Sequence, residues 1–182
     1  MKQTKHLTPN WIEDVAEPNS YRSLFKWGNP DGFKHPNTGM VNLMKDVFQL
    51  TDQDLSTPQK TGFEIFDQSI PAQIDTRHRS AFESIVGAEN IHLDTYTRTR
   101  VSYGGGMLDA LRLRQHIIEN LPDLVIDPRT NEDIQRILAY CVENQIPVNI
   151  FGAGSTVTRG VEAVKGGISL DMSKHMNKVL GF

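Results

Sequence analysis

One stretch, from residue 122 to residue 171, limits the folds open to this chain more than any other. It begins with the short apolar run Leu124 to Ile126, which is typical of a buried strand. A helix capped by Thr130 is expected next, because apolar residues then recur every three to four positions. That stripe comprises Ile134, Ile137, Leu138, Cys141 and Val142. Further strands are expected over 148–151 and 168–171, so the stretch predicts an α/β unit with a right-handed parallel crossover.

A run of small residues, Gly152-Ala153-Gly154-Ser155-Thr156, follows the second of these strands. Glycine has no Cβ, so the backbone can take positive φ and approach a ligand closely. Consecutive amides in such a turn form a concavity for an anion, and the two hydroxyl groups add donors. A phosphate or pyrophosphate is the ligand that this pattern favours. From these residues alone, a tight strand exit without a ligand is the alternative.

The better-known nucleotide and nucleophile motifs do not match this turn. No G-x-x-x-x-G-K-[ST] is present, so the lysine of a P-loop is missing. Val157 occupies the position of the third glycine in the dinucleotide motif G-x-G-x-x-G. Ser155 does not fit the G-x-S-x-G frame of a hydrolase elbow. The turn also opens no obvious helix, so a helix dipole is not available to bind the anion.

The chain before residue 119 is expected to form a mostly helical and irregular N-terminal region. We therefore predict two parts, residues 1–118 and a lobe over 119–182. The triplet Gly104-Gly105-Gly106 is interpreted as a flexible hinge between them. The other expected elements are an extended arm to about residue 37, a helix over 38–50, a loop over 51–74, a helix from Asp75 or Thr76 to Val86 stopped by Gly87, a strand over 91–103 and a helix over 108–120.

Composition excludes several classes of protein. The formal net charge is -3, from 19 basic and 22 acidic residues, so no general attraction to nucleic acid is expected. No apolar run approaches the roughly 20 residues that a transmembrane helix needs. Six histidines lack the spacing of metal ligands. The single cysteine, Cys141, lies on the apolar helix stripe and is expected to be a buried, inert thiol in a reducing, cytoplasmic setting.

Five arginines lie near the turn and the glycine triplet in the sequence. Arg159 follows the turn, and either contacts a phosphate or lies solvated on the rim of the loop. The other four are interpreted as a solvated basic face around the hinge. They are Arg98, Arg100, Arg112 and Arg114.

The order and spacing of these pieces resemble the vanillyl-alcohol-oxidase (PCMH) type of FAD-binding domain. The matching residues are Pro122-Asp123-Leu124-Val125, Pro128, Asn131-Glu132-Asp133-Ile134, Ile146-Pro147-Val148, the run over 152–156 and Ile168-Ser169-Leu170-Asp171. Upstream, Phe25-Lys26-Trp27-Gly28, the helix over 38–50 and the segment over 103–114 resemble the N-terminal region of the alkyldihydroxyacetonephosphate synthase (alkylglycerone-phosphate synthase) family. The resemblance extends from about Trp11 to the end of the chain.

The resemblance implies that FAD is the cofactor and that the turn wraps its pyrophosphate. The positions carried over are Ile150, Phe151, Gly152, Ala153, Gly154, Ser155 and Thr156. Ala153 departs from the all-glycine turn common in the family. Its methyl group is tolerable only with a negative φ, so its backbone amide should face the phosphate.

The resemblance also implies the chemistry of a flavoenzyme, namely exchange of the acyl group of an acyl-dihydroxyacetone phosphate for a fatty alcohol. A related FAD-linked oxidase or dehydrogenase of 2-hydroxy acids or alcohols, of the D-lactate or glycolate oxidase type, stays open. The 182 residues end before the second flavin lobe and the cap domain of the family, so we expect an incomplete chain without catalytic residues that is inactive alone. A non-catalytic interaction module, with a possible homodimer, is the third alternative.

Overall fold

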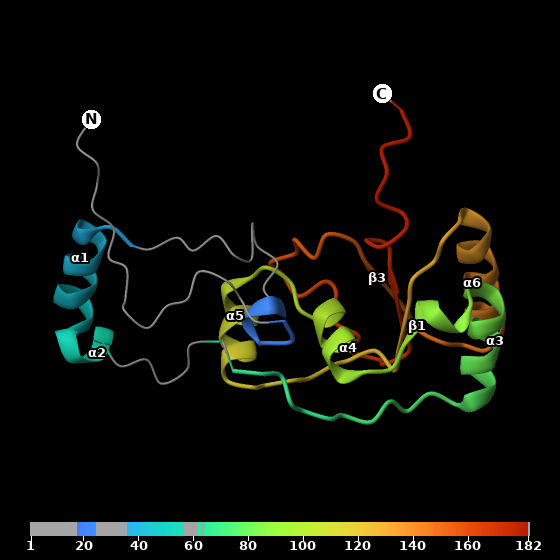
Figure 1. Ribbon diagram of the computed structural model, residues 1–182, viewed down its shortest axis with the longest axis horizontal. Coiled ribbons are helices and arrows are strands. Elements are labelled where there is room, and N and C mark those ends of the chain that lie inside the picture. Colours follow the sequence, from blue (N-terminus) through green and yellow to red (C-terminus); the bar gives the residue numbers. More distant parts are fainter. Residues whose placement is uncertain (1–17, 25–35, 57–61, 63, 182) are drawn as a thin grey trace.

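The computed structural model of this chain describes residues 18–24, 36–56, 62 and 64–181. Its elements follow the order η1 (Arg22–Leu24), α1 (Thr38–Phe48), α2 (Asp52–Ser56), α3 (Thr76–Val86), η2 (Ala88–Asn90), β1 (Ile91–His92), α4 (Thr95–Ser102), α5 (Met107–Arg114), β2 (Leu124–Ile126), α6 (Asn131–Glu143), β3 (Val148–Phe151) and β4 (Ile168–Asp171), where η marks a 3-10 helix. Helices α1 and α2 lie at the end of the molecule away from the sheet (Figure 1). None of the described helices is long and apolar enough to span a bilayer.

The strands form one four-stranded sheet in the order β1-β2-β4-β3. β4 is parallel to both of its neighbours, and only β1 is antiparallel to its partner β2. The α6 connection therefore joins two parallel strands, β2 and β3, with β4 inserted between them. Because the three strands run the same way, their carboxyl ends meet at one edge of the sheet, where α/β proteins bind ligands.

Helices cover both faces of this sheet. On one face, α3 and α6 lie side by side (Figure 1) and pack on the strands. That core contains Phe82, Ile85, Val86, Leu124, Ile126, Ile137, Cys141, Ile168 and Leu170. Strand side chains alternate between faces, so Val125 points to the opposite side, where it packs with Val101 of α4 and Phe151. The three layers confirm the predicted α/β class, with a small, mostly parallel sheet.

The strongest local signals of the sequence are confirmed. Asp75 caps α3, because its side chain accepts a hydrogen bond from the Arg77 amide, and Gly87 ends that helix with a φ of 86°. Thr130 caps α6 by accepting from the Asp133 amide at 3.1 Å. β2, β3 and β4 have the predicted bounds.

Three weaker predictions for elements were wrong. Only Ile91 and His92 of the strand expected over 91–103 are extended, because the Asp94 side chain accepts from the Thr97 amide and starts α4 instead. The expected loop over 51–74 contains the short helix α2. The helix expected over 108–120 ends at Arg114.

The N-terminal part is only partly described. Most of the extended arm expected to about residue 37 lies outside the described residues, but Tyr21 and Leu24 within it are buried. The division at residue 118 stays a prediction. Contacts cross that position, since α3 shares the core of β2 and β4, and β1 pairs with β2.

Candidate functional site

The turn over residues 152–156, called the glycine turn from here on, leaves the sheet at the carboxyl end of β3. Phe151 before it is buried, and it pairs in register with Asp171 of the neighbouring β4. Gly152, Ala153 and Ser155 are exposed, whereas Gly154 is buried with a φ of 66°. The sequence therefore places a bend that requires glycine at the edge where parallel α/β sheets bind ligands.

The amides of the glycine turn are free to bind a ligand. Within the described part of the chain, none of the N–H groups of residues 152–156 donates to a protein acceptor. By contrast, the Thr156 carbonyl accepts from the Gly105 amide at 2.9 Å. Backbone amides without a protein acceptor are satisfied by water or by a ligand. A row of donors of this kind is what the oxygen atoms of a diphosphate require.

The space beside the turn also fits an anion. A Cβ atom added at Gly152 would meet no heavy atom within 4 Å, so the backbone there borders open space. Ala153 keeps a negative φ, as the sequence required, so its methyl group causes no backbone strain. Ile150 is 66% exposed at the sheet edge. The residues present therefore fit the diphosphate of FAD.

The glycine triplet 104–106 packs against the glycine turn. Its interpretation as a flexible hinge was wrong. All three glycines are buried. The Gly104 amide donates to Asp109 Oδ2 at 2.9 Å, and Gly105 donates to Thr156. A Cβ at Gly104 would overlap the Thr156 carbonyl oxygen. The triplet lacks side chains because the glycine turn packs directly against its backbone.

A buried charge cluster fixes the segment that follows the turn. Arg112 of α5 donates to Glu162 Oε1 at 2.5 Å, and Arg159 donates to both Glu162 oxygens at 2.5 and 2.7 Å. Burial raises the pKa of Glu162, but hydrogen bonds from Arg159, Asn120 and Arg112 outweigh it and lower that pKa to about 2. Arg159 is therefore held by a carboxylate in this structure, and does not point to the turn as a free cation.

The interpretation of the other arginines as a solvated face was wrong for Arg98 and Arg112. Arg98 is 2% exposed and donates to the carbonyl groups of Pro122 and Ile70 at 2.6 and 2.7 Å. Burial lowers the pKa of Arg98. The two carbonyl partners lie 24 and 28 residues away in the sequence, so no local pattern predicts these hydrogen bonds.

Arg100, interpreted from the sequence as part of the solvated face, lies at the end of the strand that leads into the turn. Its guanidinium pairs with the buried Asp171 carboxylate and lies 5.5 Å from the centre of the Phe151 ring. Arg100 thus lies beside the last residue before the glycine turn. The sequence shows Arg100, but it does not show that Arg100 pairs with Asp171, which lies 71 positions away.

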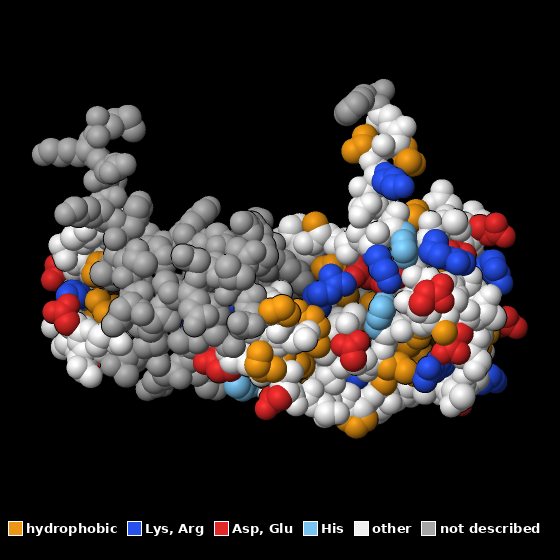
Figure 2. Space-filling view, in the orientation of Figure 1, with side chains coloured by type: hydrophobic (Ala, Val, Ile, Leu, Met, Phe, Trp, Pro, Cys, Tyr) orange, Lys and Arg blue, Asp and Glu red, His pale blue; other side chains and the backbone are white. Residues whose placement is uncertain are grey.

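A second polar group lies at the same edge of the sheet. Asp127, directly after β2, accepts from His92 Nε2 at 2.7 Å and pairs with Lys174 Nζ at 3.0 Å. Burial raises the pKa of Asp127, but these two partners outweigh it, so the net direction is down. The described residues contain no group of histidine, cysteine and acidic side chains that could hold a metal ion. Basic and acidic side chains are intermixed over the described part of the face in Figure 2.

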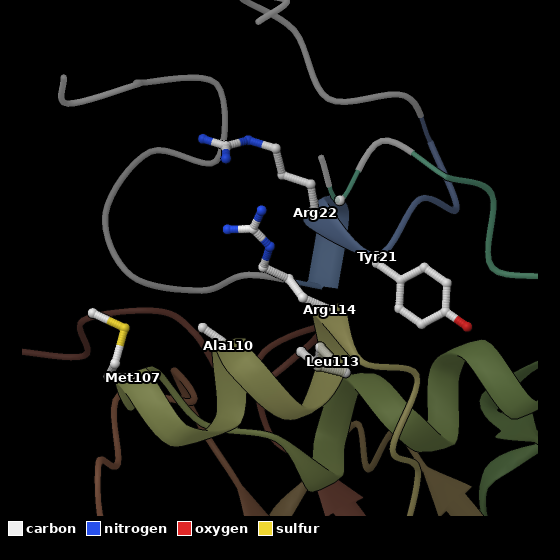
Figure 3. Close-up of a pocket in the computed structure, with 7 residues that line it drawn as sticks. Tyr21, Arg22, Met107, Ala110, Leu113 and Arg114 are labelled. Atoms are coloured by element: carbon white, nitrogen blue, oxygen red, sulfur yellow. The ribbon is translucent and has the colours of Figure 1, made fainter. Parts of the chain in front are cut away.

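A separate cavity of about 190 Å³ lies against α5 (Figure 3). Met107, Ala110 and Leu113 line its floor, and the side chains of Arg22 and Arg114 extend over it. Its volume is below the roughly 300–1,000 Å³ of a typical ligand site. The glycine turn does not line this cavity, so it is not part of the candidate site.

Comparison with known proteins identifies related sequences and folds. Residues 122–182 match the family described as "FAD binding domain". Alkyldihydroxyacetonephosphate synthase of Trypanosoma brucei brucei is 29% identical over 130 residues, covering 70% of this chain and 21% of that protein. Glycolate oxidase subunit GlcD of Bacillus subtilis is 39% identical over 62 residues, covering 34% of this chain and 13% of that protein.

A solved structure described as "alkyldihydroxyacetonephosphate synthase in P1" has the same fold. It superimposes with a TM-score of 0.59 at 24% sequence identity, covering 62% of this chain and 23% of that one. This chain therefore spans less than a quarter of the length of each of these relatives.

Proposed function

Residues 122–182 belong to an FAD-binding domain of the PCMH type, with FAD as its cofactor, and from this premise we propose that the glycine turn binds the pyrophosphate of FAD. The contact would involve residues 150–156, chiefly through their backbone amides. One observation carries the proposal: five consecutive amides at the carboxyl edge of the sheet have no acceptor among the described residues.

Each part of the turn has a separate role in this proposal. The Gly152 backbone borders open space, so a phosphate oxygen can approach its amide. Gly154 supplies the positive φ at the bend, which would turn the amides that follow it toward the same phosphate. The hydroxyl groups of Ser155 and Thr156 add donors. Gly104 and Gly105 position the turn, because Gly104 packs against Thr156 and the Gly105 amide donates to the Thr156 carbonyl. When bound, FAD supplies the redox or carbon-bond chemistry, and the protein supplies binding and orientation.

For the intact protein, we propose a flavoenzyme related to alkyldihydroxyacetonephosphate synthase, which exchanges acyl for alkyl on a dihydroxyacetone phosphate. The match to the trypanosomal synthase covers 130 residues and so reaches well upstream of the FAD-binding domain. The match to GlcD covers only 62 residues. Its higher identity, 39%, keeps an FAD-linked oxidase or dehydrogenase of 2-hydroxy acids as the second candidate. A lipid-like substrate, a homodimer and a cytoplasmic location belong to the same proposal.

Titration of the purified chain tests the cofactor role. We expect saturable binding of FAD, followed by flavin fluorescence, and of ADP, the half of FAD that carries the diphosphate, followed by calorimetry. A chain that binds neither compound but self-associates would refute the proposal in favour of a non-catalytic interaction module.

A substitution in the turn tests the residues. Ala153→Ile adds a branched side chain where the amide must meet phosphate, so we expect retention of FAD to be lost. Ala139→Ile, at an exposed position of α6, is the matched control and should bind as the wild type does. Unchanged binding by the Ala153 variant would remove the turn from the site.

A further inference from the structure

We propose that Arg100 is the cation of the diphosphate site, binding the phosphate with the part of its guanidinium that Asp171 does not use. The inference rests on the proposed function of the glycine turn and adds a residue to that site. It places a side chain of α4, from the chain before the FAD-binding match, in direct contact with the ligand.

The glycine turn lacks a positive charge of its own. Its donors are backbone amides and two hydroxyl groups, whereas a diphosphate carries about two negative charges. The nearest arginine in sequence, Arg159, is bidentate to Glu162. A cation from another element would therefore balance part of the ligand charge.

Arg100 reaches the carboxyl ends of β3 and β4 from the face of the sheet that α4 covers. Its guanidinium lies over the Phe151 ring and pairs with Asp171, and these two residues are register partners at the carboxyl ends of β3 and β4. Since Gly152 follows Phe151 directly, the cation contacts the side chain of the residue that precedes the first amide of the turn. The geometry fixes its position through one ion pair and one aromatic contact.

The guanidinium has unused donors. Arg100 bonds Asp171 through Nη2 alone, and its Nε and Nη1 donors meet no acceptor among the described residues. Its side chain is 31% exposed, whereas that of Arg112 is 7% exposed and bonds three carboxylates. An arginine fork has five N–H groups, so one edge can hold Asp171 while another binds a phosphate.

Asp171 serves to position this cation. Its carboxylate is buried, and its other oxygen accepts from the amide and hydroxyl of Ser173 at 2.9 and 2.6 Å. Both oxygens are therefore occupied, and the carboxylate cannot turn to face the ligand. The arrangement holds the guanidinium in place before a ligand arrives, which lowers the entropic cost of binding.

The test measures binding of ADP and of inorganic pyrophosphate by calorimetry. We expect Arg100→Gln to weaken both by about 10- to 100-fold, the effect of losing a hydrogen bond between charged groups. Arg79→Gln is the matched control, because Arg79 is a partly exposed arginine of α3 that is also paired with a carboxylate, Glu83. This control should bind both probes as the wild type does.

Removal of Arg100 leaves Asp171 buried without its partner, so the single variant can lose stability. The double variant Arg100→Gln with Asp171→Asn removes both charges and keeps the acceptor for Ser173, and it decides the question if the single variant does not fold. Wild-type affinity for both probes in a folded variant would overturn the role of Arg100 while the proposed function stands. A wild-type chain that binds neither probe would overturn both.

Discussion

Gly104→Ala tests whether the glycine triplet positions the glycine turn. An added Cβ would lie 2.8 Å from Thr156 Cγ2 and 3.2 Å from Asp109 Oδ2, and it would overlap the Thr156 carbonyl oxygen. Carbon atoms pack at about 3.5–4.0 Å, so the backbone at Thr156 must retreat by about 1 Å. That movement also strains the hydrogen bond from the Gly105 amide, which is 2.9 Å long.

The expected loss of stability follows from the tight contact and from the strained hydrogen bond. Overpacking a tight contact costs about 1–3 kcal/mol, and loss of a hydrogen bond costs about 0.5–1.5 kcal/mol. We therefore expect a loss of about 2–4 kcal/mol, which at about 2–4 °C per kcal/mol lowers the Tm by roughly 4–16 °C. Because the amides of the turn move together, ADP affinity should fall by at least about tenfold, the effect of one lost bond to a charged group.

Thermal unfolding measures the change in Tm, and calorimetric titration measures the change in ADP affinity. Gly160→Ala is the control within the same loop, since its added Cβ would lie 3.5 Å from Thr156 Oγ1, an ordinary contact. It should melt and bind as the wild type does. If Gly104→Ala also behaved as the wild type, the triplet would not support the turn and our account of its glycines would be wrong.

Two further predictions concern buried titratable groups. The pKa of folded Glu162, about 2, lies below its ordinary value of 4.5, so the ionised form stabilises the fold above the ordinary value and this contribution disappears as the pH falls toward 2. We therefore compare the free energy of unfolding in urea at about pH 5 and about pH 3. It should fall less for Glu162→Gln than for the wild type or for Glu132→Gln, a control at an exposed position. Equal decreases in all three proteins would show that Glu162 is not held ionised by its arginine partners. Burial raises the pKa of Cys141 to about 11, so a thiol reagent at about pH 8 should label it only in urea. Rapid labelling of the native chain would show that this thiol is not buried.

The sequence predicted the parts of this fold that depend on neighbouring residues. Thr130 and Asp75 cap helices through amides two or three positions away, and the stripe around Ile137 needs only helical spacing. The bend at the glycine turn was predictable for the same reason, because it depends on five consecutive residues. Contacts across the chain were not predictable in this way.

Helix α4 and the arginines show why the remaining features were missed. Residues 95–102 contain threonine, tyrosine and valine, which favour strands, and carry no apolar stripe. Their helix depends on the Asp94 cap and on burial of Thr99 and Val101 against other elements. The pairing of Arg112 with Glu162 spans 50 residues. Only the folded chain distinguishes such buried cations from a solvated face.

The same pairing makes the proposed diphosphate site compatible with a net charge of -3. Repulsion matters only from nearby charges, because salt screens the rest beyond about 8 Å. Near the turn, the carboxylates are already paired: Glu162 with Arg112 and Arg159, and Asp171 with Arg100. Because these carboxylates are paired with arginines, the groups that would meet the ligand in the proposed site are the amides of the turn and the free edge of Arg100. Local arrangement, and not net charge, therefore decides the affinity of this site for an anion.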